Sequence, residues 1–120
     1  MTLSVTVHRR DPATGALIDE PTDEPGATLA GFEVWRTSVY GSPAVQRRGA
    51  RFLPTLAHTD LLIEGTDLAE FIAECTSLLN DADALAAETQ VGVEALRFRI
   101  GNFVRAATKA QEIAGLLSVS

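Results

Sequence analysis

The feature that most constrains the fold is a helical repeat of apolar residues in the C-terminal half of the sequence. Apolar residues recur at steps of three and four over residues 93–114, and a second series with the same period covers residues 66–88. Such spacing is typical of amphipathic helices that pack one apolar face on a core. Residues 89–92 separate the two series, so we expect an antiparallel helical hairpin. Residues 80–83, Asn-Asp-Ala-Asp, leave open whether the first helix breaks there.

The remaining segments have the short, apolar or alternating pattern of strands. Residues 2–9 alternate between aliphatic and polar side chains, and a turn rich in Pro and Gly leads to a short return strand at residues 16–18. Residues 31–40 are rich in β-branched and aromatic residues, with apolar groups on both faces, which favours a central strand or an edge strand that meets a partner. Apolar runs at residues 61–64 and 116–119 predict two more strands, one on each side of the helical hairpin.

Together these elements predict an α+β fold. The helical hairpin returns the chain to the end of the sheet it left, so the strands at residues 61–64 and 116–119 should be antiparallel. We predict a small antiparallel sheet of about 4–5 strands with a C-terminal antiparallel helical hairpin packed on one face. Residues 1–120 are expected to form a single domain, because half this length would leave a marginal core. Within it, the acidic, proline-containing residues 19–26 form a solvated loop, and a short helix covers residues 43–48.

Composition argues against several classes of protein. A net charge of -6 weighs against a nucleic-acid binder, because neutralising phosphates needs surplus positive charge. The single cysteine excludes an internal disulfide and a multi-cysteine zinc site. No apolar run approaches the ~18 residues of a membrane span, and the first residues lack the order of a secretory signal. We therefore expect a cytoplasmic protein with no membrane association and no cofactor.

No motif in the sequence names a reaction. His8 lies on the polar face of its predicted strand, with no carboxylate or nucleophile placed beside it by local spacing. His58 and Asp60 lie two residues apart and are compatible with metal ligation from a loop, but the spacing supplies no third ligand. Cys75 sits within the apolar face of a helix, where a thiol is usually buried and inert. We therefore predict no catalytic residue and no metal site.

The charges are strongly segregated along the chain. Residues 60–88 contain eight acids and no base, whereas residues 36–51 and 97–109 each contain four basic residues and no acid. In one interpretation the two sets pair inside the fold, where each surface pair contributes only ~0–1 kcal/mol. In the other, an acidic helix face stays free and docks on a basic partner, which it selects by sign. The residues of that face are Glu70, Glu74, Asp81 and Asp83, with Trp35 as a weaker aromatic anchor.

This build is similar in general terms to that of small bacterial inhibitor or immunity proteins. We therefore predict a non-enzymatic binding protein that occludes a basic site on a partner protein, provided that its acidic face is free of arginines from the same molecule. One alternative is an assembly module that forms a homo-oligomer through a sheet edge or around Phe98, which lies opposite the apolar face of its helix. A third hypothesis is a metal-dependent enzyme that uses His58 and Asp60.

Overall fold

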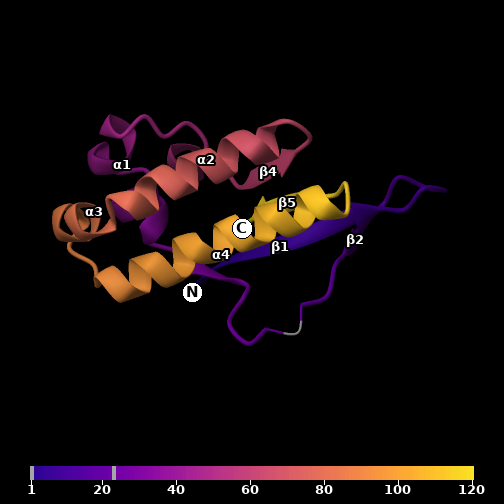
Figure 1. The fold of residues 1–120 in the computed structure, drawn as a ribbon, viewed down its shortest axis with the longest axis horizontal. Helices are drawn as coiled ribbons and strands as arrows, with labels where there is room; N and C mark the ends of the chain where they lie inside the picture. Colours follow the sequence, from indigo (N-terminus) through magenta and orange to yellow (C-terminus); the bar gives the residue numbers. More distant parts are fainter. Residues whose placement is uncertain (1, 23) are drawn as a thin grey trace.

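The computed structural model describes residues 2–22 and 24–120. They form an α+β fold in which a five-stranded antiparallel sheet carries a layer of helices (Figure 1). The strands are β1 (Thr2–Arg10), β2 (Leu17–Asp19), β3 (Leu29–Phe32), β4 (Leu61–Glu64) and β5 (Leu116–Val119). The helical elements are the π-helical turn η1 (Arg36–Tyr40), α1 (Pro43–Arg47), the 3-10 segment η2 (Leu53–Ala57), α2 (Asp67–Asn80), α3 (Ala82–Thr89) and α4 (Val93–Glu112). The predicted fold class is confirmed.

The N-terminal strand β1 organises the sheet, because both of its edges are paired. On one edge β5 runs antiparallel to it, with Val5 opposite Val119, and β4 follows beyond β5. On the other edge β2 pairs with residues 8–10 and β3 pairs with residues 2–4. The predicted hairpin of the first two strands and the antiparallel pairing of β4 with β5 are both confirmed.

Helices α2 and α4 form the predicted antiparallel hairpin and cover one face of the sheet (Figure 1). The rings of Phe71 and Phe103 meet there edge-on, with 5.8 Å between their centroids, and both are fully buried. Leu3 and Ile63 close the core from the sheet side. Fully burying one such side chain contributes about 1.5–3 kcal/mol, so the contact of the hairpin with the sheet is the main source of stability.

The prediction of a strand over residues 31–40 is wrong for most of its length, because β3 ends at Phe32. Gly31 has a φ of +123°, and a Cβ atom there would lie 2.7 Å from the ring of Trp35. The chain turns at Glu33 and Val34 and continues into η1, which brings Tyr40 beside Trp35 with 5.9 Å between ring centroids. The Tyr40 hydroxyl donates to a carbonyl of β3. Apolar residues on both faces, which favour a central strand in the sequence, here surround a tight helical turn.

Two junctions determine how α2 leads into α3 and how α4 leads into β5. The first helix of the hairpin breaks, since α2 ends at Asn80 and α3 begins at Ala82. At the far end, Gly115 passes close to the edge of β1, where a Cβ atom would lie 2.2 Å from the carbonyl oxygen of His8. Any other residue at this position would push β5 away from β1.

Candidate functional site

The predicted acidic face is neutralised by arginines of the same molecule. Each pair joins a guanidinium nitrogen to a carboxylate oxygen at short distance. The pairs are Arg51–Glu70 at 2.7 Å, Arg48–Asp81 at 2.6 Å and Arg97–Asp83 at 3.1 Å. A basic partner would have to displace these arginines, so paired carboxylates attract it less than free ones do. The premise of a free acidic face is therefore wrong, because the segregated charges pair within the fold.

Both carboxylate oxygens of Glu74 accept hydrogen bonds from backbone N–H groups, so this side chain is already engaged within the molecule. Its Oε1 accepts the backbone N–H groups of Arg51 and Phe52, the latter at 2.9 Å, and its Oε2 accepts the N–H of Leu53 at 2.9 Å. Such charge-assisted hydrogen bonds are about twice as strong as neutral ones. Glu74 therefore fastens residues 51–53 to α2.

Arg48 links α1 to α3 within the same surface. Its guanidinium lies 2.6 Å from Asp81 Oδ2 and 2.6 Å from Glu88 Oε2. The hydrogen bond to Asp81 is the main cause that raises the pKa of Arg48, and the hydrogen bond from Arg48 is the main cause that lowers the pKa of Glu88. This junction therefore stays ionised to lower pH than an isolated glutamate would.

Trp35 lies in the core and not on a contact surface. It is only 5% exposed, and its ring meets those of Phe32 and Tyr40 edge-on, each with 5.9 Å between centroids. Its prediction as a surface anchor is therefore wrong, because η1 folds the ring inward. Phe98 is 42% exposed, in keeping with its position opposite the apolar face of α4.

His58 and Asp60 are not brought together with a third ligand. Both are exposed, and Asp60 Oδ1 lies 2.6 Å from Arg36 Nη2. Within residues 2–22 and 24–120, no group of three His, Cys, Asp or Glu side chains is arranged to hold a metal ion. Cys75 is fully buried, and burial raises the pKa of its thiol well above the usual value, so the thiol is poorly suited to nucleophilic chemistry.

In the fold, the His8 ring lies beside two side chains that are distant from it in the sequence. Its Nε2 lies 2.7 Å from Ser118 Oγ on β5, and its Nδ1 lies 2.8 Å from Asp19 Oδ1 at the end of β2. Serine, histidine and aspartate in this order are the groups used in nucleophilic acyl transfer. The three side chains come from three adjacent strands, on the sheet face opposite the helices.

Two features argue against catalysis at His8. Acyl transfer needs hydrogen-bond donors for an oxyanion, but the nearby strands are paired with each other through their backbone groups. Asp19 is 77% exposed, and its oxygen is too poorly aligned with Nδ1 to form a hydrogen bond. We therefore assign His8 to tying β1 to its two neighbouring strands.

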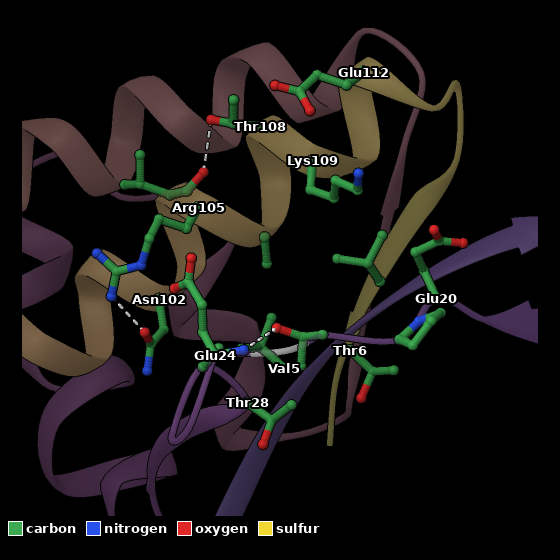
Figure 2. A pocket seen from close by; sticks show the side chains of 16 residues that line it. Val5, Thr6, Glu20, Glu24, Thr28, Asn102, Arg105, Thr108, Lys109 and Glu112 are labelled. Atoms are coloured by element: carbon green, nitrogen blue, oxygen red, sulfur yellow. Dashed lines mark hydrogen bonds between the residues drawn. The ribbon is translucent and has the colours of Figure 1, made fainter.

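A cleft of about 520 Å³ opens between α4, β1 and the loop segments of residues 20–22 and 24–28 (Figure 2). Its volume falls within the roughly 300–1,000 Å³ typical of small-ligand sites. The floor is apolar, and the two walls carry both signs of charge. The side chains that matter below are Val5, Val7 and Val104 on the floor, Glu20 and Glu24 on the loop wall, and Arg105, Lys109 and Glu112 on the helix wall.

The cleft opens where β2 and β3 diverge from β1. Even-numbered residues of β1 exchange backbone hydrogen bonds with β5, so the odd-numbered residues direct theirs to the opposite edge. There Glu20 N–H donates to Val7 C=O at 2.8 Å, and Val5 N–H donates to Thr28 C=O at 2.9 Å. Between these two bonds, Val5 C=O and Val7 N–H form no hydrogen bond with the described residues of the loop.

The cations of the helix wall differ from most others in the part of the chain that the structure describes. Seven of the nine arginines form an ion pair, whereas Arg105 and Lys109 form none with the carboxylates that the structure describes. They lie four residues apart and therefore face the same side of α4. Arg99, the remaining arginine, stacks its guanidinium on the ring of Phe32 at 5.3 Å.

Asn102 joins the loop wall to α4. It is 1% exposed, and its Nδ2 donates to the carbonyls of Gly26 at 3.0 Å and Leu29 at 2.7 Å, while its Oδ1 accepts from Arg105. The signal in the sequence was a polar amide next to a glycine in the middle of an amphipathic helix. Its meaning was missed because the two carbonyls lie more than 70 positions earlier in the chain.

Comparison with known proteins adds no relative: no family model, curated protein or solved structure matches this chain. No helix among the residues that the structure describes is both long enough and apolar enough to cross a membrane. The function is therefore argued from the cleft and its residues alone.

Proposed function

We propose that this chain is a non-enzymatic binding protein whose ligand site is the cleft between α4, β1 and residues 20–28. The observation that carries the proposal is the pair Arg105 and Lys109, which make no described ion pair in a molecule that pairs most of its other cations. Positive charge beside an apolar floor suits a ligand with an anionic group and an apolar body.

This proposal keeps the predicted class of protein and changes the surface. The carboxylates of Glu70, Asp81 and Asp83 are engaged by arginines, so they no longer support occlusion of a basic site. The cleft, in contrast, is formed within the folded chain, and its loop wall is held by Asn102. A preformed site loses little conformational freedom on binding, which favours affinity.

Self-association is the second candidate, because apolar side chains are exposed at the N-terminal half of α4. A Cβ atom on Gly26 would lie 3.2 Å from Phe98 and 3.7 Å from Leu29, so these two side chains are neighbours. Phe32 and Val34 are exposed in the same part of the sequence as Leu29. Sedimentation coefficients that rise with protein concentration would favour this candidate.

The cleft proposal is tested by thermal-shift titration with a panel of small carboxylates that each carry one apolar group. We expect at least one of them to raise the Tm saturably, since a ligand at 100 times its Kd stabilises a protein by about 2.7 kcal/mol. Lys109→Gln should remove most of the shift, because the uncharged amide no longer attracts the carboxylate of the ligand.

Arg97→Gln is the matched control for Lys109→Gln. Arg97 lies on the same helix, pairs with Asp83 and does not line the cleft. This variant should keep the full ligand-induced shift. The proposal is wrong if no carboxylate stabilises the protein, or if the shift survives intact in Lys109→Gln.

A further inference from the structure

We infer that the cleft captures the C-terminal residue of a partner's peptide chain, an inference that rests on the proposed function of the cleft. Three groups carry it. Val5 C=O offers an acceptor, Val7 N–H offers a donor, and Lys109 offers a cation on the wall above them. A terminal residue presents the complementary set: one N–H donor and a carboxylate.

The open stretch of the β1 edge is one residue wide. It is closed on one side by the bond from Glu20 N–H to Val7 C=O at 2.8 Å, and on the other by the bond from Val5 N–H to Thr28 C=O at 2.9 Å. An added strand of several residues would have to break both bonds. A single peptide unit needs only the remaining acceptor and donor, in the manner of strand addition to a sheet edge.

Charge favours a terminal residue over an internal one. The N–H of the terminal residue donates to Val5 C=O, and one carboxylate oxygen accepts from Val7 N–H. The second oxygen is then available to the cations of the helix wall, Lys109 and Arg105, which form no ion pair with the described carboxylates. An internal peptide unit would supply both backbone bonds but no partner for these cations.

The floor and rim of the cleft select the side chain of the ligand. Val5, Val7 and Val104 line the cleft and favour an aliphatic side chain. Glu24 and Glu112 line the same cleft and disfavour an acidic one, because like charges brought together lower affinity. The expected ligand is therefore a peptide that ends in a residue such as leucine or valine.

Residues 116–120 of a second copy are not the occupant, because they are held in their own sheet. Residues 116–119 form β5 inside the sheet, and Ser120 exchanges backbone hydrogen bonds of 3.0 and 2.7 Å with Ser4. This segment is therefore committed to its own sheet and is not available to a neighbouring copy.

The test is a titration followed by ¹⁵N NMR with three probes: N-acetyl-glycyl-leucine, its C-terminal amide, and the smaller 4-methylpentanoate, which keeps the carboxylate and the aliphatic group but lacks the peptide unit with its N–H. We expect the free acid to bind and to shift the Val7 amide resonance downfield, as a new hydrogen bond would. The amide and 4-methylpentanoate should each bind about tenfold more weakly or worse, since each lacks one of the paired groups.

Two variants of α4 sharpen the test. Lys109→Gln should weaken binding of the free acid about tenfold and leave binding of the amide unchanged, whereas Arg97→Gln should change neither. Equal affinity for the acid and the amide, or for the acid and 4-methylpentanoate, overturns the inference and leaves the cleft as a site for another ligand. Absence of peptide binding overturns it as well, while the carboxylate panel decides the proposed function separately.

Discussion

The helical layer has two flanks, and they neutralise their charges in opposite ways. On the paired flank, formed by residues 43–60 with α2 and α3, arginines reach across to the carboxylates of the helices, and Glu74 holds three backbone amides. On the cleft flank, formed by residues 20–28 and the C-terminal half of α4, Arg105 and Lys109 meet no described carboxylate.

The paired flank places α1 and η2 against α2 and α3, whereas the cleft flank places a loop against α4. The paired flank is closed by contacts within the molecule. The cleft flank is held by the Asn102 side chain and by two backbone hydrogen bonds to β1, and the cleft between these contacts is open to ligands. The comparison shows that the distinctive charges of this protein are the two cations of the cleft flank that form no ion pair with a described carboxylate. The more numerous acidic residues of α2 and α3 are less distinctive, because arginines pair with them.

Removing the anchor of the cleft flank should have the largest effect on stability. Asn102→Ala leaves the carbonyls of Gly26 and Leu29 without their donor, and we expect the free energy of unfolding in urea to fall by about 2–4 kcal/mol. Gln111→Ala removes an exposed amide from the same helix and should cost less than ~0.5 kcal/mol. If Asn102→Ala behaves like this control, the loop wall is held by other contacts and the two flanks are more alike than we describe.

Removing the charge of Glu74, the central carboxylate of the paired flank, should have the second-largest effect on the free energy of unfolding. Glu74→Gln keeps the shape of the side chain but removes the charge that three amides share, so we expect a loss of about 1.5–3 kcal/mol in urea unfolding. Glu70→Gln breaks only an exposed pair with Arg51 and should cost less than ~1 kcal/mol. Equal losses for the two variants would contradict the structural role assigned to Glu74.

Lowering the pH should have the smallest effect on stability, but it should distinguish the two flanks most directly. The pKa of Glu88 is lower in the folded protein than in the unfolded chain, where it is about 4.3. Its pairing with Arg48 is therefore fully present above that value and is lost as the pH falls through the folded pKa. Hydrogen-exchange protection factors in α3 should fall more than those of residues 24–30, whose anchor Asn102 does not titrate.

The variant Arg48→Gln provides the control for the pH experiment. It removes the cause of the lowered pKa, so protection in α3 should be weaker at neutral pH and less sensitive to acid. An identical pH response in wild-type protein and Arg48→Gln would remove the electrostatic basis of the comparison between the flanks.

The sequence predicts well those parts of the molecule that depend on local spacing. Helix α4 and the strand pair β4 and β5 follow from periodicity, because one face of each element must be buried. The same periodicity left open whether the helix breaks at residues 80–83, and the structure shows that it does. The close approach of the Trp35 ring to the backbone of Gly31 could not be predicted from local spacing, because only the fold brings the two together.

The candidate site was harder to predict than the fold, because its partners are distant in the sequence. The segregation of charge is visible in the chain, but which acid meets which arginine is decided by the packing of α1 and η2 against α2 and α3. Asn102 reaches carbonyls 73 and 76 positions away, and His8 reaches a serine 110 positions away. Such contacts carry no local pattern.

The sequence contains one tryptophan and one tyrosine, and the fold places them side by side between the sheet and α4. The guanidinium of Arg99 lies 5.5 Å from the Trp35 ring, and the backbone of Gly31 lies against it. Indole emission from this molecule therefore comes from a single place, next to the strand that borders the loop wall. The protein thus contains its own optical reporter, and strain transmitted to β3 can be followed in the native chain without attaching a dye.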